Sequence, residues 1–203
     1  MLMGYPITLH LRDKAVLVVG GGPVATHRVC RLLTAGARVT VVAPRLSSAL
    51  GELAAADRLR WLPRHYRTGM LTRPERVWLV HTATGVPDVD ETVASDAERL
   101  GIWCVRADDG ARSAAWSPAV AEGAPGTPAE GLTVAVTGDR DPRRARAVRD
   151  AILAALDSGT LPVRRQRPSP TTTAAGPGWR PPASWATDPR GVGALVGGVG
   201  GAG

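Results

Sequence analysis

The sequence contains no phenylalanine, only two cysteines, and a single lysine, Lys14, among its 25 basic residues. We interpret the missing phenylalanine and the excess of arginine as base composition rather than function. The cysteines, Cys30 and Cys104, stand far apart and belong to no CxxC pair or Cys/His cluster. The sequence therefore predicts neither a disulfide framework nor a structural zinc site, and a reducing cytoplasm is the expected location.

A membrane segment and a basic stripe are also missing. No window approaches the roughly 18 apolar residues of a membrane span, and residues 1–6 carry no basic-then-apolar leader. Of the net charge of +7, the segment after residue 157 contributes +4, from five arginines against Asp188, which leaves +3 for the rest. The remaining arginines are scattered, so we expect an anionic small molecule as partner rather than nucleic acid or a membrane.

The clearest feature that is present is a glycine-rich turn. The apolar run 16–19 enters Gly20-Gly21-Gly22-Pro23-Val24-Ala25, which has the pattern of a dinucleotide-binding turn. Gly20 permits a tight turn, Gly22 leaves room for the backbone to approach a pyrophosphate, and Ala25 replaces the third glycine where helix packs on strand. The N–H groups at the start of the following helix would point at the anion.

The context of this turn favours a nucleotide site over a purely structural turn. Residues 24–35 repeat apolar side chains at helical spacing and end at Gly36, and a second strand is predicted at 38–43. That strand ends in Ala43-Pro44-Arg45, without the acid that usually binds a ribose 2′-hydroxyl. Arg45 would suit a 2′-phosphate, so the residues leave NAD and NADP both open.

Strands and helices continue to alternate along the chain. Helices are predicted at 46–56 and 88–100, and strands at 58–62, 77–84 and 102–105. This order predicts an α/β fold with a Rossmann-type, doubly wound parallel sheet. His81 lies inside an apolar strand and is expected to be a core histidine, whereas His27 is expected to be exposed.

Ligands of such sheets bind beyond the carboxyl ends of the strands. This rule selects the glycine turn, Ala43 to Arg45, Thr82-Ala83-Thr84-Gly85, and Ala107-Asp108-Asp109. Only the last group offers carboxylates, and taken alone Asp108-Asp109-Gly110 reads slightly better as a solvated turn. A final strand at 132–136 and a helix at 141–156, with Asp141 as N-cap, complete the ordered region.

Taken together, these motifs resemble the precorrin-2 dehydrogenase/sirohydrochlorin ferrochelatase family, the amino-terminal module of siroheme synthases. The resemblance spans about Tyr5 to Leu156. It rests on five segments: Tyr5-Pro6-Ile7 with Leu11-Arg12-Asp13-Lys14, residues 18–25, residues 39–44, Thr82-Ala83-Thr84, and Asp108 with Ala114-Ala115-Trp116-Ser117-Pro118. The end of the chain, 191–201, resembles the start of a uroporphyrinogen-III methyltransferase domain, so a truncated fusion is expected.

The resemblance implies an NAD-dependent oxidation of precorrin-2 to sirohydrochlorin, followed in many members by insertion of Fe²⁺. It makes Asp108 the candidate catalytic base, and the side chain that would briefly contact Fe²⁺, with no resident metal. The expected cofactor contacts come from the motifs already described: Gly20, Gly21, Gly22, Pro23, Val24, Ala25, Ala43, Pro44, Arg45, Thr82, Ala83 and Thr84. The arginines nearest the candidate segments, as partners for substrate carboxylates, are Arg106, Arg112, Arg143 and Arg146.

The resemblance also implies a domain layout and a homodimer. We expect a nucleotide-binding domain at 1–115, a small dimerisation and substrate region at 116–157, and a disordered linker with the methyltransferase-like stub at 158–203. The chain departs from the family at Gly85-Val86-Pro87, at Thr137 to Arg140, and in the insertion 122–130. These departures put the chelatase in doubt more than the dehydrogenase.

Two alternatives to an active dehydrogenase remain open. A non-catalytic dinucleotide-sensing module would need the glycine turn but no carboxylate beside it. An inactive truncated fragment is the other alternative.

Overall fold

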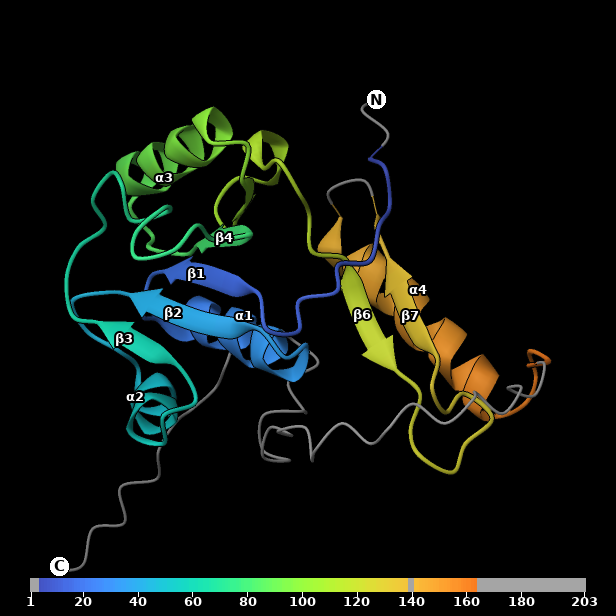
Figure 1. Cartoon of the computed structure of the whole chain (residues 1–203). Helices are drawn as coiled ribbons and strands as arrows, with labels where there is room; N and C mark the ends of the chain where they lie inside the picture. The colour runs from blue at the N-terminus through green and yellow to red at the C-terminus, as the bar shows by residue number, and fades with distance from the viewer. Residues whose placement is uncertain (1–3, 139–140, 164–203) are drawn as a thin grey trace, which may run out of the picture. The chain divides into compact units, whose positions relative to one another are not determined.

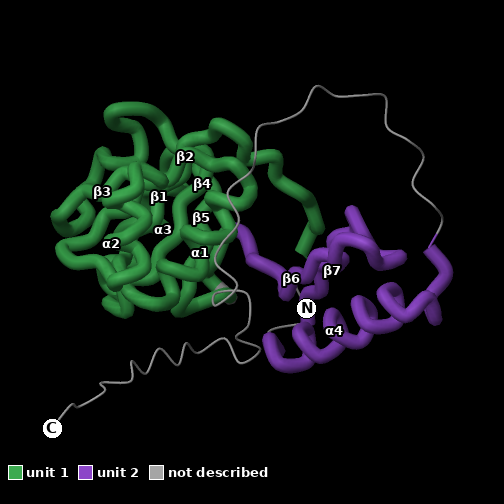
Figure 2. Tube along the Cα trace, turned by 90° about the horizontal axis from the view of Figure 1, so that it is seen from below, with its two compact units in different colours: residues 1–114, 176–203 green, residues 115–175 purple. Residues whose placement is uncertain are grey.

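The computed structural model describes residues 4–138 and 141–163 and divides them into two compact units, one up to Ala114 and one from Ala115 on (Figure 2). The expected tail after residue 163 and its methyltransferase-like stub lie outside the described residues, as do Asp139 and Arg140. Within the described ranges, no helix has the length and hydropathy of a membrane-spanning segment.

The first unit is built on a five-stranded, fully parallel sheet. Its strands are β1 (Ala15–Val19), β2 (Arg38–Val42), β3 (Arg60–Leu62), β4 (Leu79–Thr82) and β5 (Trp103–Arg106). They are ordered β3-β2-β1-β4-β5, so the chain reverses direction across the sheet between β1 and β4. This is the arrangement in which parallel α/β sheets bind ligands.

Three helices cover this sheet. They are α1 (Pro23–Thr34), α2 (Ser48–Ala55) and α3 (Pro87–Arg99), and a short 3-10 turn, η1 (Gly110–Arg112), follows β5. Figure 1 shows α3 on one face of the sheet and α1 and α2 on the other. The predicted doubly wound parallel sheet is therefore confirmed.

Burial on both faces explains the composition of the strands. All five residues of β1 and all four of β4 are buried, which is why both read as continuous apolar runs. His81 in β4 is 5% exposed, as expected of a core histidine, and His27 on α1 is exposed. On the α3 face, Leu17, Val80 and Val93 pack in the core.

The end of α1 shows how one glycine fixes a boundary. Gly36 adopts φ +77, and the N–H groups of Gly36 and Ala37 donate to the carbonyls of Leu33 and Leu32. This is a Schellman cap, which a residue with a side chain would strain. The chain then turns directly into β2.

The second unit is a hairpin packed with a helix. Strands β6 (Ala119–Glu122) and β7 (Thr133–Val136) pair antiparallel, and α4 spans Pro142–Asp157. Asp141 caps α4, since its Oδ1 accepts from the N–H groups of Arg143 at 3.0 Å and Arg144 at 2.9 Å. The sequence predicted β7 and α4 but not β6. Residues 123–132, which include most of the insertion, connect the two strands.

Candidate functional site

Four predicted segments meet at one edge of the parallel sheet, because parallel strands end on the same side. They are the glycine turn after β1, residues 43–45 after β2, residues 82–85 at the end of β4, and residues 107–109 after β5. The site is therefore built from the carboxyl ends of four strands of the first unit.

Two of the three glycines lock the neighbouring loops against the turn. Gly20 has φ +125, and a Cβ there would lie 2.2 Å from the carbonyl oxygen of Ala83. A Cβ on Gly21 would lie 2.0 Å from the carbonyl oxygen of Arg45. The N–H of Ser47 donates to the Gly21 carbonyl at 2.8 Å, so the backbones of three loops are in direct contact.

Gly22 differs from the other two, because a Cβ on it would meet nothing within 4 Å. It is the N-cap of α1 and makes no side-chain cap. Among the described residues, no acceptor bonds the N–H groups of Val24 and Ala25. Unpaired N–H groups at a helix start attract anions, so this open backbone cradle fits a pyrophosphate. Ala25 is fully buried where α1 meets the sheet.

The loop after β2 is held to α1 by side chains. The hydroxyls of Thr26 and Ser47 hydrogen-bond at 2.9 Å, and Ser47 Oγ caps α2 by accepting from the Leu50 N–H. Ala43 is buried, whereas Pro44 and Arg45 are exposed. This loop, residues 43–47, therefore offers one exposed positive side chain, Arg45, and contains no acid.

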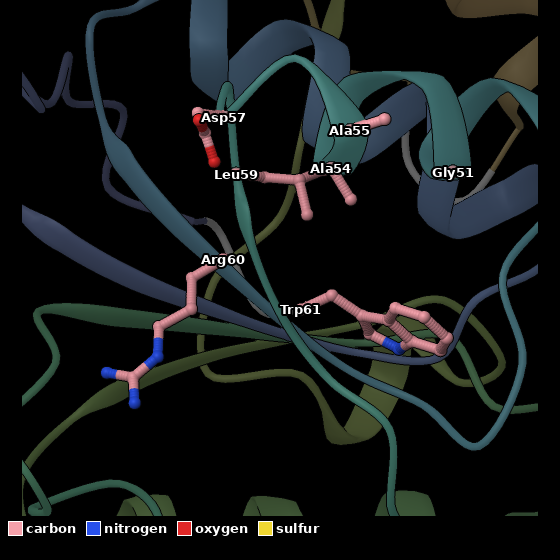
Figure 3. A pocket seen from close by; sticks show the side chains of 7 residues that line it. All are labelled: Gly51, Ala54, Ala55, Asp57, Leu59, Arg60 and Trp61. Atoms are coloured by element: carbon pink, nitrogen blue, oxygen red, sulfur yellow. The ribbon is translucent and has the colours of Figure 1, made fainter.

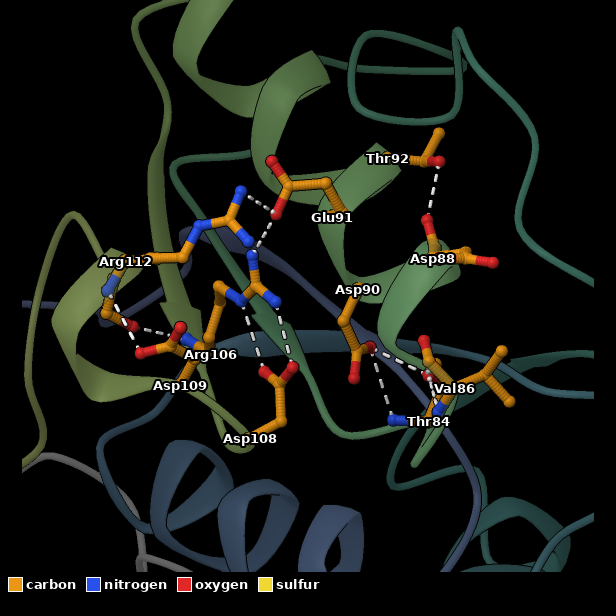
Figure 4. Close-up of polar contacts among 11 residues, drawn as sticks. Thr84, Val86, Asp88, Asp90, Glu91, Thr92, Arg106, Asp108, Asp109 and Arg112 are labelled. Carbon is orange, nitrogen blue, oxygen red and sulfur yellow. Dashed lines mark hydrogen bonds and ion pairs between the residues drawn. The ribbon is translucent and has the colours of Figure 1, made fainter.

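The loop after β4 is fixed by an acid, Asp90, that lies outside the predicted motifs. Thr84 Oγ1 donates to Asp90 Oδ1 at 2.8 Å, and the Thr84 N–H lies 3.4 Å from the same oxygen (Figure 4). Asp90 is completely buried on α3. In the part of the chain that the structure describes, Asp90 Oδ2 and Thr82 Oγ1 have no hydrogen-bond partner.

Asp108 forms a two-pronged ion pair with Arg106. Arg106 Nε donates to Asp108 Oδ1 at 3.1 Å, and Nη2 donates to Oδ2 at 2.8 Å (Figure 4). The Arg106 side chain is 3% exposed and that of Asp108 is 28% exposed. The guanidinium of Arg106 thus lies inside the protein, and the Asp108 carboxylate that it binds is partly exposed at the end of β5.

Glu91 of α3 holds the other side of this arginine. Arg106 Nη1 donates to Glu91 Oε2, and Arg112 Nη2 lies 2.7 Å from the same oxygen. Arg106 therefore binds two carboxylates, those of Asp108 and Glu91, and Arg112 binds that of Glu91. Both arginines were candidates for substrate carboxylates, and each binds at least one acid of this chain. Arg143 and Arg146 lie on α4 of the second unit.

Asp108 and Asp109 have separate roles. Hydrogen bonds from Arg106 hold the pKa of the Asp108 carboxyl below its ordinary value, against the opposing effect of partial burial, so Asp108 is ionised at neutral pH. Asp109 Oδ1 accepts from the Arg112 N–H at 3.3 Å, within η1. The turn that Asp108-Asp109-Gly110 suggested is thus made by Asp109, and Asp108 points to the arginine.

A hollow lies where α2 ends and β3 begins (Figure 3). One of its lining residues, Trp61, donates from Nε1 to the Ala43 carbonyl of the candidate site at 2.9 Å. The lining comes from Gly51, Ala54, Ala55, Asp57, Leu59, Arg60 and Trp61. None of these residues belongs to the predicted site.

The fold and the open cradle at Gly22 define a dinucleotide-binding α/β protein. Residues 7–119 match the model of a family described as putative NAD(P)-binding, and the chain belongs to that family. The cofactor class that this supports is a nicotinamide dinucleotide.

Similar proteins have names from one pathway. The chain is 37% identical over 152 residues to siroheme synthase 1 of Aeromonas salmonicida, and 37% identical over 156 residues to siroheme synthase of Chromobacterium violaceum. These matches cover 74% and 76% of the chain, and 31% of each relative. The chain thus spans less than a third of these relatives.

A solved structure, SirC, precorrin-2 dehydrogenase, superposes with a TM-score of 0.63 at 26% identity. It covers 77% of this chain, which in turn covers 73% of it.

Proposed function

We propose that this chain oxidises precorrin-2 to sirohydrochlorin, with NAD⁺ as the acceptor, in the siroheme pathway. The similarity to siroheme synthases and to a precorrin-2 dehydrogenase supports the substrate. One observation carries the catalytic role: an ionised carboxylate, Asp108, lies at the same sheet edge as a cradle for a dinucleotide.

The residues of the cradle would bind and orient the cofactor. The N–H groups of Val24 and Ala25 would hold the pyrophosphate, with Gly22 allowing close approach. Thr82 to Thr84 would line the nicotinamide end, because they end the strand next to β1. The chemistry that NAD⁺ supplies when bound is acceptance of a hydride.

Asp108 would remove the proton that this oxidation releases. Conversion of precorrin-2 to sirohydrochlorin takes away two hydrogens, one as hydride to NAD⁺ and one as a proton. The carboxylate of Asp108 would take the proton, become a neutral acid, and return it to water. Its ionised state at neutral pH leaves it ready to do so.

The proposal extends to insertion of Fe²⁺ into sirohydrochlorin as a second step. Metal entry displaces two pyrrole N–H protons, and Asp108 would accept them in turn. Adding Fe²⁺ only after oxidation is complete separates the two steps, because siroheme differs from sirohydrochlorin in absorption.

We further propose that the chain works as a homodimer in the cytoplasm, with the second unit forming the contact. On α4, Ala145 is buried but Val148 is 42% exposed, so the helix keeps apolar surface available. Sedimentation of the purified protein would give a dimer mass if this holds and a monomer mass if it does not.

The direct test incubates the purified protein with precorrin-2 and NAD⁺ without oxygen. We expect the tetrapyrrole spectrum to become that of sirohydrochlorin while an equal amount of NADH appears. A dinucleotide-sensing module would bind NAD⁺ and leave the spectrum unchanged, and an inactive fragment would neither bind NAD⁺ nor change the spectrum. Either result would refute the proposed oxidation.

A further inference from the structure

We infer that Arg106 is a positioning residue, which holds the Asp108 carboxylate in one orientation at the end of β5, and that Glu91 and Arg112 brace this arginine. The inference rests on the proposed function, in which Asp108 takes the proton. It adds three residues to the catalytic region that the motifs do not include.

The geometry of the pair fixes both carboxylate oxygens. Arg106 donates through Nε and Nη2 to different oxygens of Asp108, at 3.1 and 2.8 Å. A planar guanidinium that binds both oxygens sets the plane of the carboxylate, which a single hydrogen bond cannot do. Each oxygen keeps a further lone pair that can accept a proton from the substrate.

The backbone on either side of Arg106 is held as well. The Ala107 N–H donates to the Thr82 carbonyl at 3.0 Å, so the strand pairing continues to the residue just before Asp108. The Arg106 N–H donates to Ser113 Oγ at 2.6 Å. The side-chain fork therefore completes a segment whose main chain is already fixed.

The burial of Arg106 supports a positioning role, because the arginine is inside the protein while the carboxylate that it binds stays accessible. Among the ion pairs of the described residues, Arg106 has the most buried cation, at 3% exposure, whereas Arg38, which pairs with Glu75, is 58% exposed. Burying an arginine costs solvation free energy, which two carboxylates offset here. Asp108, at 28% exposure, is more exposed than the arginine that it binds, and it lies at the sheet edge where ligands bind.

Glu91 makes the arrangement rigid. It lies on α3 and accepts from Arg106 on the side opposite Asp108, while Arg112 binds the same Glu91 oxygen at 2.7 Å. Asp108 thus pairs with Arg106 of β5, Glu91 of α3 and Arg112 of η1 lie behind this arginine, and Asp109 follows Asp108 in the chain. Rotation of Arg106 would break contacts with two elements at once.

The test compares three variants of the full chain with a matched control. Arg106→Met removes the fork, Arg106→Lys keeps the charge without the fork, and Glu91→Gln weakens the brace. Arg38→Met is the control, since it removes an arginine from a carboxylate pair at the start of β2, remote from the site. Thermal unfolding and NAD⁺ titration are measured for each, and kcat and KM for precorrin-2 follow.

Both Arg106 variants should lose about 10²-fold in kcat, as expected for a misplaced catalytic group, with little change in KM or NAD⁺ affinity. Glu91→Gln should lose less, and Arg38→Met nothing. Wild-type kcat in both Arg106→Lys and Glu91→Gln would overturn the inference. Glu91 is 41% exposed, so Glu91→Gln should fold. Together with Arg106→Lys it tests the inference even if Arg106→Met does not fold.

A second readout does not depend on turnover. The ¹³C shift of the Asp108 carboxyl, assigned by its loss in Asp108→Asn, is followed against pH. The pKa obtained from this titration should lie below the ordinary range of a carboxyl in the wild type, and it should be higher in Arg106→Met. If this shift occurs but the wild type does not oxidise precorrin-2, the proposed function fails and the positioning stands. An unchanged titration overturns the positioning itself.

Discussion

Gly20 lies so close to Ala83 that a Cβ on the glycine would be 2.2 Å from the alanine carbonyl oxygen. This contact joins the turn after β1 to the loop after β4 across the point where the strand order reverses. Gly22, two residues further on, faces open space. The glycines of one motif therefore do different things, Gly20 closing the fold and Gly22 leaving room for a ligand.

This difference predicts opposite effects of the same substitution. Gly20→Ala should destabilise the protein by about 1–3 kcal/mol, because the methyl group clashes and φ +125 is strained. Gly22→Ala should change stability by less than about 0.5 kcal/mol but weaken NAD⁺ binding at least about tenfold. Chemical denaturation and NAD⁺ titration check both. Equal loss of stability in the two variants would contradict this division of roles.

The choice of cofactor depends on Arg45 in this account. Arg45→Ala should weaken NADP⁺ binding about tenfold or more, the effect of losing one charged hydrogen bond, and leave NAD⁺ binding nearly unchanged. Calorimetric titration of both nucleotides measures this, with the exposed Arg60→Ala as control. If the affinities for NAD⁺ and NADP⁺ fall by the same factor, Arg45 does not bind the 2′-phosphate.

His81 should make stability depend on pH. Burial, aided by repulsion from Arg28, lowers the pKa of His81 from 6.5 to about 4. The unfolded chain therefore takes up the proton first as pH falls. The stabilisation by neutral His81 is complete above pH 6.5 and is lost between about 6.5 and 4, by about 3 kcal/mol.

Urea unfolding between pH 7 and 4 tests this expectation. The His81→Leu variant should lose about 3 kcal/mol less than the wild type over that interval, whatever its stability at pH 7. His27→Leu, on the exposed side of α1, should follow the wild type. Parallel pH curves for wild type and His81→Leu would show that His81 does not titrate as its burial requires.

Asp90 should matter for the loop after β4. Asp90→Ala removes the acceptor of the Thr84 N–H and leaves the Thr84 hydroxyl only its longer bond to the Val86 carbonyl, at 3.2 Å, and should cost about 1–3 kcal/mol. Asp88→Ala is the control, an exposed acid in the same first turn of α3. Hydrogen exchange of the Thr84 amide should accelerate only in Asp90→Ala. If Asp88→Ala has the same effect, helix-end charge rather than the hydrogen bond is responsible.

The sheet could be predicted because local patterns determine it. Strands such as β1 are buried on both faces, so their apolar runs are uninterrupted, and Gly36 marks a helix end through its backbone alone. The predicted and observed boundaries of the strands differ by one or two residues. Trp78, predicted within β4, is 61% exposed just before it.

The elements that were missed depend on distant partners. Strand β6 has four residues, all half-buried or exposed, and exists through pairing with β7, which no local pattern reveals. The bond between Arg106 and Glu91 likewise requires α3 to pack beside β5. Arg106 and Asp108 are only two residues apart, but β5 ends at Arg106 and the chain bends at 107–108, so strand alternation does not predict their pairing.

The central claim is that Asp108 takes the proton during oxidation, and a single-turnover experiment with Asp108→Ala tests it most directly. NADH formation is followed after precorrin-2 is mixed with NAD⁺-saturated protein. The account predicts wild-type NAD⁺ affinity and a rate of NADH formation lower by at least about 10²-fold. NADH formation at the wild-type rate would contradict it.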